Sequence, residues 1–152
     1  MKIGLISDTH SLLRPEALAA LQGCDQLIHA GDIGKPEILE ALRAIAPLTV
    51  VRGNNDQDDS WAGDVPFSAR LDVEGVSIYV THILADVPKP LPDGVRVVIV
   101  GHSHKPLIQQ IDGVLYINPG SAGPRRFKLP ISVALLHIDG QGLRAELVEL
   151  AV

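Results

Sequence analysis

Apolar residues occur along the chain in short continuous runs, and each run ends abruptly in polar residues. In the first third, three such runs alternate with stretches whose apolar residues recur at helical spacing, which predicts strand–helix–strand–helix–strand. The strands are predicted at 3–7, 26–30 and 48–51, and the helices at 16–22 and 36–45. Pro15 and Pro36 favour the helix starts, because proline lacks only an N–H that the first helical residue leaves unpaired. Uninterrupted apolar runs are typical of buried strands in a parallel sheet.

The second half of the chain changes to paired strands separated by tight turns. The turns are predicted at Glu74-Gly75, at Asp112-Gly113 and at 139–142. The strands around them are predicted at 68–73 with 76–81, 107–111 with 114–117, and 132–138 with 143–150, with one further buried strand at 96–100. Segment 57–66 is predicted to be a polar loop, and segment 83–94 is predicted to be a second loop because it contains three prolines. This order predicts two packed sheets with helices outside, in a single domain over 1–152.

Composition narrows the class of protein. Of the 152 residues, 46% are hydrophobic and 20% charged, which is typical of a globular chain. The net charge of −5 argues against a basic surface that wraps nucleic acid. Cys24 is the only cysteine, so an internal disulfide is excluded and a reducing compartment is favoured. We find no signal-peptide pattern and no apolar run long enough to span a bilayer, so a soluble, cytoplasmic protein is expected.

Residues with metal-ligand chemistry follow five of the predicted strands. They are Asp8 with His10, Asp32, Asn54, His82, and His102 with His104. Ligands in open α/β sheets gather beyond the carboxyl ends of the strands, so we expect these side chains to meet at one edge. Oxygen and imidazole ligands suit Mn, Fe, Zn or Ni. Seven ligands are more than one tetrahedral ion needs, but they fit two ions that share a carboxylate. A pair of metals about 3.5–4 Å apart is suited to in-line displacement at phosphorus.

These segments carry a family resemblance. Asp8-Thr9-His10, Gly31-Asp32, Gly53-Asn54-Asn55-Asp56, His82 and Gly101-His102-Ser103-His104, in this order, resemble the motifs of the calcineurin-like metallophosphoesterase superfamily. Within it the chain is similar to the small single-domain bacterial and archaeal phosphodiesterases, from Lys2 to about Arg126. The resemblance implies an α/β fold, a four-layer αββα sandwich of two mixed β-sheets flanked by helices, with a dinuclear metal site at the sheet edges.

The resemblance also implies a ligand set and a reaction. One metal would be held by Asp8, His10 and His104, with Asp32 bridging, and the second by Asp32, Asn54, His82 and His102. Two divalent ions per chain are expected, with manganese first and iron, zinc or nickel as alternatives. The implied enzyme is a metal-dependent phosphodiesterase in which a bridging hydroxide attacks phosphorus in line. No side chain acts as nucleophile, and Asp32, Asn54 and His82 contribute through the metals.

Two positions depart from the family pattern. Larger members often have His after the ligand Asn, as a leaving-group acid or transition-state stabiliser, and here that position is Asn55. An amide cannot donate a proton usefully at neutral pH, which favours activated or diester substrates over monoesters. The residue after His82 is often Gly, whereas here it is Ile83, whose side chain is expected to narrow the site or shift the following loop.

Two other functions are kept as alternatives. One is a phosphomonoesterase acting on a small nucleotide or sugar phosphate. The other is a non-catalytic metal-binding scaffold, since the family includes a sorting-complex subunit of similar fold. The expected partner is a small phosphoester substrate, with no membrane and no nucleic acid, and assembly as a homodimer or homotetramer is left open. No insertion large enough for a cap domain is present, so we expect an open site without a defined leaving-group pocket.

The remaining polar residues have mainly structural interpretations. His29 and His137 lie inside predicted strands, and a lone histidine is weak evidence for a metal site. Asp56 either orients a ligand or caps a turn. Segment 118–121 resembles a loop that many relatives place near the site, but it is also an ordinary turn sequence. We expect Arg125 and Arg126 on the surface and Cys24 in the core.

Overall fold

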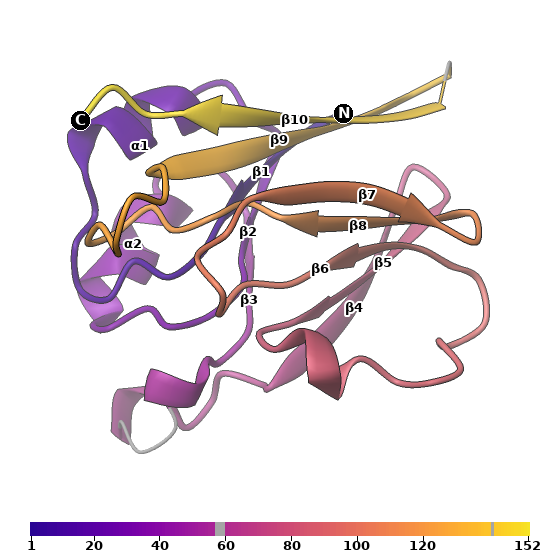
Figure 1. Ribbon diagram of the computed structural model, residues 1–152, viewed down its shortest axis with the longest axis horizontal. Coiled ribbons are helices and arrows are strands. Elements are labelled where there is room, and N and C mark those ends of the chain that lie inside the picture. Colours follow the sequence, from indigo (N-terminus) through magenta and orange to yellow (C-terminus); the bar gives the residue numbers. More distant parts are fainter. Residues whose placement is uncertain (57–59, 141) are drawn as a thin grey trace.

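The fold consists of two mixed five-stranded sheets packed face to face (Figure 1). The computed structural model describes residues 1–56, 60–140 and 142–152. The first sheet has the order β10 (Gly142–Glu149), β9 (Ser132–Asp139), β1 (Lys2–Ile6), β2 (Gln26–His29) and β3 (Leu48–Val50). The second has the order β4 (Ser68–Val73), β5 (Val76–Thr81), β6 (Val95–Ile99), β8 (Val114–Asn118) and β7 (Leu107–Ile111). Strands β1, β2 and β3 are parallel, as are β5, β6 and β8, and the outer pairs are antiparallel.

The predicted elements are present, with small differences at their ends. Helices α1 (Pro15–Leu21) and α2 (Pro36–Arg43) begin at the two prolines, and α2 ends two residues earlier than predicted. Strand β1 ends at Ile6 rather than at Ser7, because the backbone turns away from the sheet into a left-handed conformation at Asp8.

Both predicted loops contain a short 3₁₀ turn. Segment 83–94 includes η3 (Leu84–Asp86), and the described part of 57–66 includes η2 (Ser60–Ala62). A third turn, η1 (Asn54–Asp56), follows β3. The predictions at 57–59 and at position 141 lie outside the described residues.

Most of the core lies between the two sheets. Leu5 and Ile28 of the first sheet pack with Val80 and Ile99 of the second, and all four are fully buried. The neighbouring residue Ile6 points to the opposite face, as the alternation of side chains along a strand requires. Uninterrupted apolar runs are therefore buried on both faces, as the sequence predicts.

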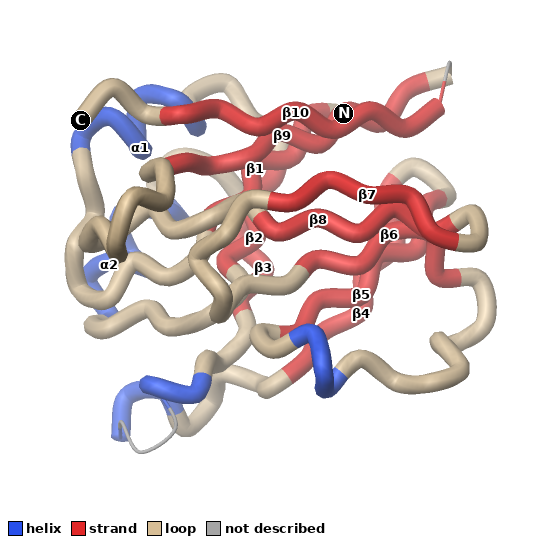
Figure 2. The backbone as a smooth tube through the Cα atoms, in the orientation of Figure 1, coloured by secondary structure: helices blue, strands red, loops and turns tan. Residues whose placement is uncertain are grey.

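The outer faces of the two sheets are covered differently. Helices α1 and α2 lie against the first sheet (Figure 2). Their buried residues pack with Ile6 and Leu27. The outer face of the second sheet contacts Val87 and Leu91 of the segment that follows η3. Its outermost layer is therefore a 3₁₀ turn and a proline-rich segment instead of an α-helix. No helix among the described residues is long and apolar enough to cross a membrane.

Candidate metal centre

The ends of strands from both sheets meet at one edge of the sandwich. Asp8, Asp32 and Asn54 lie just beyond β1, β2 and β3 of the first sheet. His82 and His102 lie just beyond β5 and β6 of the second. Parallel neighbours end at the same edge of a sheet, and face-to-face packing brings the two edges together. The structure therefore gathers side chains that are up to 96 residues apart in the sequence (Asp8 to His104).

The first group consists of Asp8, His10 and His104, which each offer a ligand atom within 4.8 Å of the others. The Nε2 atoms of the two histidines are 3.3 Å apart. Asp8 Oδ1 lies 3.4 Å from His104 Nε2 and 3.7 Å from His10 Nε2. The other carboxylate oxygen, Oδ2, accepts hydrogen bonds from the Ser7 hydroxyl and the His102 backbone N–H. Hydrogen bonds to Oδ2 thus fix the Asp8 carboxylate, and Oδ1 faces the imidazoles of His10 and His104.

The second group consists of Asp32, His82 and His102, whose ligand atoms are also within 4.8 Å of one another. His82 Nδ1 donates a hydrogen bond to the backbone carbonyl of Ala30 at 2.7 Å. This bond orients the ring so that Nε2 lies 3.1 Å from Asp32 Oδ2. A carbonyl partner on the far nitrogen is the usual way in which a protein orients a metal-binding histidine. Asn54 joins the group through its Oδ1, which is 3.1 Å from His102 Nδ1.

Asp32 lies between the two groups. Its Oδ2 is 3.1 Å from His82 Nε2 in the second group and 3.6 Å from His10 Nε2 in the first. Its Oδ1 accepts a hydrogen bond from the backbone N–H of Asn55 at 2.8 Å. One carboxylate that faces imidazoles on both sides has the position that a bridging ligand needs.

The residues present fit a pair of divalent cations. Among the described residues, three buried side-chain atoms lack a hydrogen-bond partner, and they are Asp8 Oδ1, His82 Nε2 and His104 Nδ1. Two of these atoms, Asp8 Oδ1 and His82 Nε2, face the ligand groups, whereas His104 faces its group with the other ring nitrogen, Nε2. Buried polar atoms without partners are costly, so the two that face the groups point to a missing partner. The donors are carboxylate oxygens and imidazole nitrogens, a set that suits Mn, Fe, Zn or Ni.

The charges at the centre favour ionised carboxylates. Burial raises the pKa of Asp8, but the hydrogen-bonding imidazoles of His10 and His104 outweigh burial and hold this pKa well below its ordinary value. Burial also opposes ionisation of Asp32, and contact with His82 makes the net shift of its pKa downward. The pKa of His82 is raised, because the two carboxylates outweigh the burial of its ring. Both carboxylates are therefore charged at neutral pH, as metal ligands must be.

Five of the residues predicted as ligands have left-handed backbone conformations. Their φ angles are 56° at Asp8, 45° at His10, 57° at Asp32, 73° at His102 and 63° at His104. Residues other than glycine adopt this region rarely, and such residues cluster at functional sites because the surrounding fold imposes the strain. Here the strain turns the chain sharply at the strand ends and directs each side chain towards the centre.

Two glycines are required by close packing at the centre. A Cβ atom at Gly53 would clash with Asp32 Oδ1, and one at Gly101 would clash with Ser7 Oγ. Neither Gly53 nor Gly101 has a positive φ, so close packing is the reason for glycine at these two positions. Gly31 differs, because its φ of 106° is a conformation that favours glycine.

Asp56 connects the two loops that carry Asp32 and Asn54. Its buried carboxylate accepts hydrogen bonds from the backbone N–H groups of Ile33, Gly34 and Gly53, all between 3.0 and 3.2 Å. The sequence left open whether this residue orients a ligand or caps a turn. The observed bonds extend beyond its own turn to the loop after β2, so it positions both loops.

The loop 118–121 also contacts the centre. Asn118 donates from Nδ2 to the carbonyl of Gly101 at 3.0 Å and to the hydroxyl of Ser103 at 3.1 Å. The Ser121 hydroxyl donates to the carbonyl of Asp8 at 3.1 Å. The loop therefore supports the backbone on both sides of the first group.

Asn55 and Ile83, the two departures from the family pattern, lie beside different ligand candidates. Asn55 Nδ2 is 3.4 Å from Asp32 Oδ2 and 3.4 Å from His10 Nδ1. Ile83 is half-buried and lines a cavity beside His82. Sequence reasoning missed this cavity, because residues such as Tyr79 and Phe67 look like ordinary strand and loop residues in the sequence.

The other residues considered in the sequence lie outside the two groups. His29 is fully buried between the Gly31 N–H and the Thr9 hydroxyl, and burial lowers its pKa to about 4. His137 pairs with Glu146 on β9 and β10 at 3.0 Å. Arg125 and Arg126 are exposed, and Cys24 is buried.

The sequence profile of the calcineurin-like phosphoesterase superfamily domain matches residues 1–141. The chain belongs to this superfamily. It is 35% identical to a probable metallophosphoesterase of Methanothermobacter thermautotrophicus, over 97% of this chain and 92% of the relative. It is 28% identical to the phosphodiesterase YfcE of Escherichia coli K12, over 91% of this chain and 89% of the relative.

The same fold occurs in Vps29 of Entamoeba histolytica, whose structure was solved in complex with Zn²⁺. The TM-score is 0.74 at 21% identity, and the match covers 98% of this chain and 99% of that one. The predicted family and fold are thereby confirmed. The names of the relatives support a phosphoester hydrolase, and the metal dependence of the family agrees with the two ligand groups.

Proposed function

We propose that this protein is a metal-dependent phosphodiesterase with a dinuclear centre. Asp8, His10 and His104 would hold one divalent cation and Asn54, His82 and His102 the other, with Asp32 shared. The observation that carries the proposal is the position of Asp32 Oδ2, 3.6 Å from His10 in one group and 3.1 Å from His82 in the other. When bound, two such cations lower the pKa of a water molecule and neutralise phosphate charge.

The residues of the chain orient the ligand side chains and supply the negative charge that attracts the cations. The carbonyl of Ala30 fixes the ring of His82, and the Ser7 hydroxyl fixes one oxygen of Asp8. The ionised carboxylates of Asp8 and Asp32 attract the cations, and the surrounding imidazoles compensate their charge. Because these groups are held before substrate arrives, little reorganisation is needed at the moment of reaction.

The residue at position 55 affects which phosphoesters the centre can cleave. Its amide lies where larger family members often have an imidazole, and an amide cannot deliver a proton to a departing alkoxide at neutral pH. Esters with good leaving groups, and diesters in particular, are therefore the favoured substrates. Manganese as the native metal, a single domain and a cytoplasmic location stay predictions.

The test is hydrolysis by metal-stripped protein reconstituted with Mn²⁺. We expect bis(4-nitrophenyl) phosphate to be cleaved faster than 4-nitrophenyl phosphate under the same conditions. The Asp8→Ala, His104→Ala double variant should lose this activity, whereas His137→Ala, remote from the centre, should keep it. Activity no higher than that of the double variant would contradict the proposal, and faster cleavage of the monoester would favour a phosphomonoesterase.

The likeness to Vps29 keeps a non-catalytic scaffold as the second candidate. A scaffold would bind metal but turn over no phosphoester. Elemental analysis of the purified protein, followed by a panel of mono- and diesters, separates these functions.

A further inference from the structure

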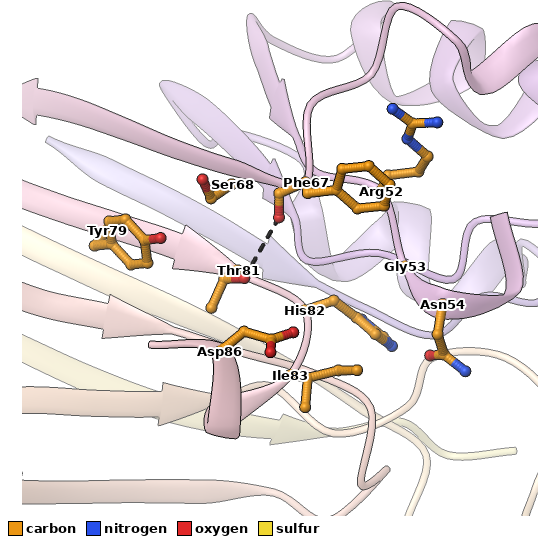
Figure 3. A pocket seen from close by; sticks show the side chains of 10 residues that line it. All are labelled: Arg52, Gly53, Asn54, Phe67, Ser68, Tyr79, Thr81, His82, Ile83 and Asp86. Carbon is orange, nitrogen blue, oxygen red and sulfur yellow. Dashed lines mark hydrogen bonds between the residues drawn. The ribbon is translucent and has the colours of Figure 1, made fainter. Parts of the chain in front are cut away.

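A cavity of about 330 Å³ opens directly beside the second ligand group (Figure 3). Asn54 and His82 form one end, and Tyr79 and Ser68 line the other. Ile83 and Asp86, from the segment after β5, close one side. A group bound here would therefore be adjacent to a phosphate at the metal centre. The volume is at the lower end for ligand pockets, which suits one small organic group.

An aromatic ring forms part of the wall. Phe67 is 54% exposed although it lines a cavity. The guanidinium carbon of Arg52 lies 4.1 Å from the ring centroid, and the Nε of Arg52 donates to the carbonyl of Val65 at 2.9 Å. The arginine thus supports one face of the ring, and the ring still has surface available. Such a supported, exposed ring is suited to stacking against a flat ligand.

Hydrogen-bonding groups line the rest of the cavity. Ser68 and Thr81 are opposite each other in the β4–β5 ladder, and Tyr79 lies two residues before Thr81 on the same face. The Thr81 hydroxyl donates to the backbone carbonyl of Phe67 at 3.4 Å, which ties the aromatic wall to β5. Asp86 adds a carboxylate, which only accepts hydrogen bonds when ionised.

These features define the chemistry of the occupant. The ring of Phe67 favours a flat group, and the hydroxyls of Ser68 and Tyr79 favour one with several hydrogen-bonding atoms. The carboxylate of Asp86 repels a second phosphate but accepts hydrogen bonds from hydroxyl or amino groups. The occupant is therefore flat and polar and carries no negative charge of its own, and it is attached to the phosphate that lies at the metal centre.

We propose that this cavity binds the nucleoside group of a nucleoside phosphodiester, an inference that rests on the proposed function of the adjacent centre. Phe67 stacks on the base, and Ser68, Tyr79 and Asp86 hydrogen-bond to the polar atoms of the nucleoside. An alkyl or simple aryl ester makes none of these hydrogen bonds and therefore binds less tightly.

The test compares two diesters with the same leaving group. Thymidine 5′-(4-nitrophenyl phosphate) carries the nucleoside, and methyl 4-nitrophenyl phosphate carries a methyl group instead. We expect wild-type protein to prefer the nucleoside ester in kcat/KM, mainly through a lower KM. The Phe67→Ala and Asp86→Asn variants should each reduce this preference by roughly tenfold. The matched control is Phe127→Ala, which removes a ring that is 88% exposed and outside the cavity, and it should keep the preference.

The two proposals fail in different ways. If neither ester is cleaved, the proposed function is wrong, and calorimetric titration of the metal-loaded protein with thymidine 5′-monophosphate still tests the cavity. Binding that is weakened by Phe67→Ala but not by Phe127→Ala supports the cavity as a nucleoside site. If both esters are cleaved with equal KM, or if Phe67→Ala leaves the preference unchanged, the nucleoside inference is overturned while the proposed function stands.

Discussion

Both carboxylate oxygens of Asp56 lie 3.0 Å from the backbone nitrogen of Ile33, although the two residues are 23 positions apart. The same carboxylate accepts from Gly53, so one buried side chain joins the loops after β2 and β3. The two loops carry the ligand candidates Asp32 and Asn54, so the relative position of these two side chains depends on Asp56.

Replacing Asp56 should therefore affect both stability and the centre. In Asp56→Asn only one oxygen can accept, and the amide NH₂ faces backbone donors, so we expect unfolding to become easier by about 1–3 kcal/mol. Urea denaturation measures this change, with the exposed Asp64→Asn as the matched control. Mn²⁺ affinity should also fall by about tenfold, as for other residues that orient ligands. A loss of stability with unchanged Mn²⁺ affinity would limit Asp56 to a structural role.

The left-handed conformations at the centre predict an inverted order of substitutions. At His102, where φ is 73°, glycine fits without strain and alanine does not. We expect metal-free His102→Gly to be more stable than His102→Ala by about 1 kcal/mol, although glycine in most ordered positions is the less stable choice. Thermal unfolding of the two variants compares them directly. Equal stability, or a more stable alanine variant, would show that position 102 carries no strain.

His29 predicts a pH dependence of folding. Burial lowers its pKa from 6.5 to about 4, so between these pH values only the unfolded chain binds the proton. Stability is therefore lost as pH falls through this window, by at most about 3 kcal/mol from this residue. The His29→Asn variant keeps an acceptor for the Gly31 N–H but does not titrate. Urea denaturation between pH 7 and pH 4 should show a smaller loss of stability for this variant, and parallel curves would rule out His29 as the cause.

Asn55 predicts a gain of function. The side-chain nitrogen of Asn55 is 3.4 Å from His10 and Asp32, so an imidazole at position 55 would be next to both ligand groups. Asn55→His should accelerate hydrolysis of diesters with alkyl leaving groups by at least about tenfold, because these alkoxides need a proton. Diesters with 4-nitrophenolate as leaving group should gain little. Steady-state hydrolysis rates of the two diester types test this prediction. If Asn55→His changes both rates by the same factor, position 55 does not provide acid assistance.

The sequence predicts the strand ends well, for a physical reason. Asp8, Asp32 and His82 each lie one to three residues beyond the end of a strand, so the position of the strand fixes the position of the ligand candidate. The parallel order of the strands then gathers these residues at one edge without further information.

Other features depend on contacts between distant segments and could not be predicted. The bonds of Asp56 reach the loop after β2, and nothing in its local sequence specifies them. The cavity beside His82 combines Phe67, Tyr79 and Asp86 from a loop, a strand and a 3₁₀ turn, each ordinary in isolation. The covering of the second sheet by a proline-rich segment likewise depends on packing that the local pattern does not encode.

The centre takes ligand candidates from both sheets, with Asp8 beyond β1 and His104 beyond β6. A cation held between them would cross-link the two layers of the sandwich and bind the folded chain far better than the unfolded one. Thermodynamic linkage then raises the free energy of unfolding by about 2.7 kcal/mol when free metal exceeds its dissociation constant a hundredfold. Cellular metal supply would accordingly tune the thermodynamic stability of the fold.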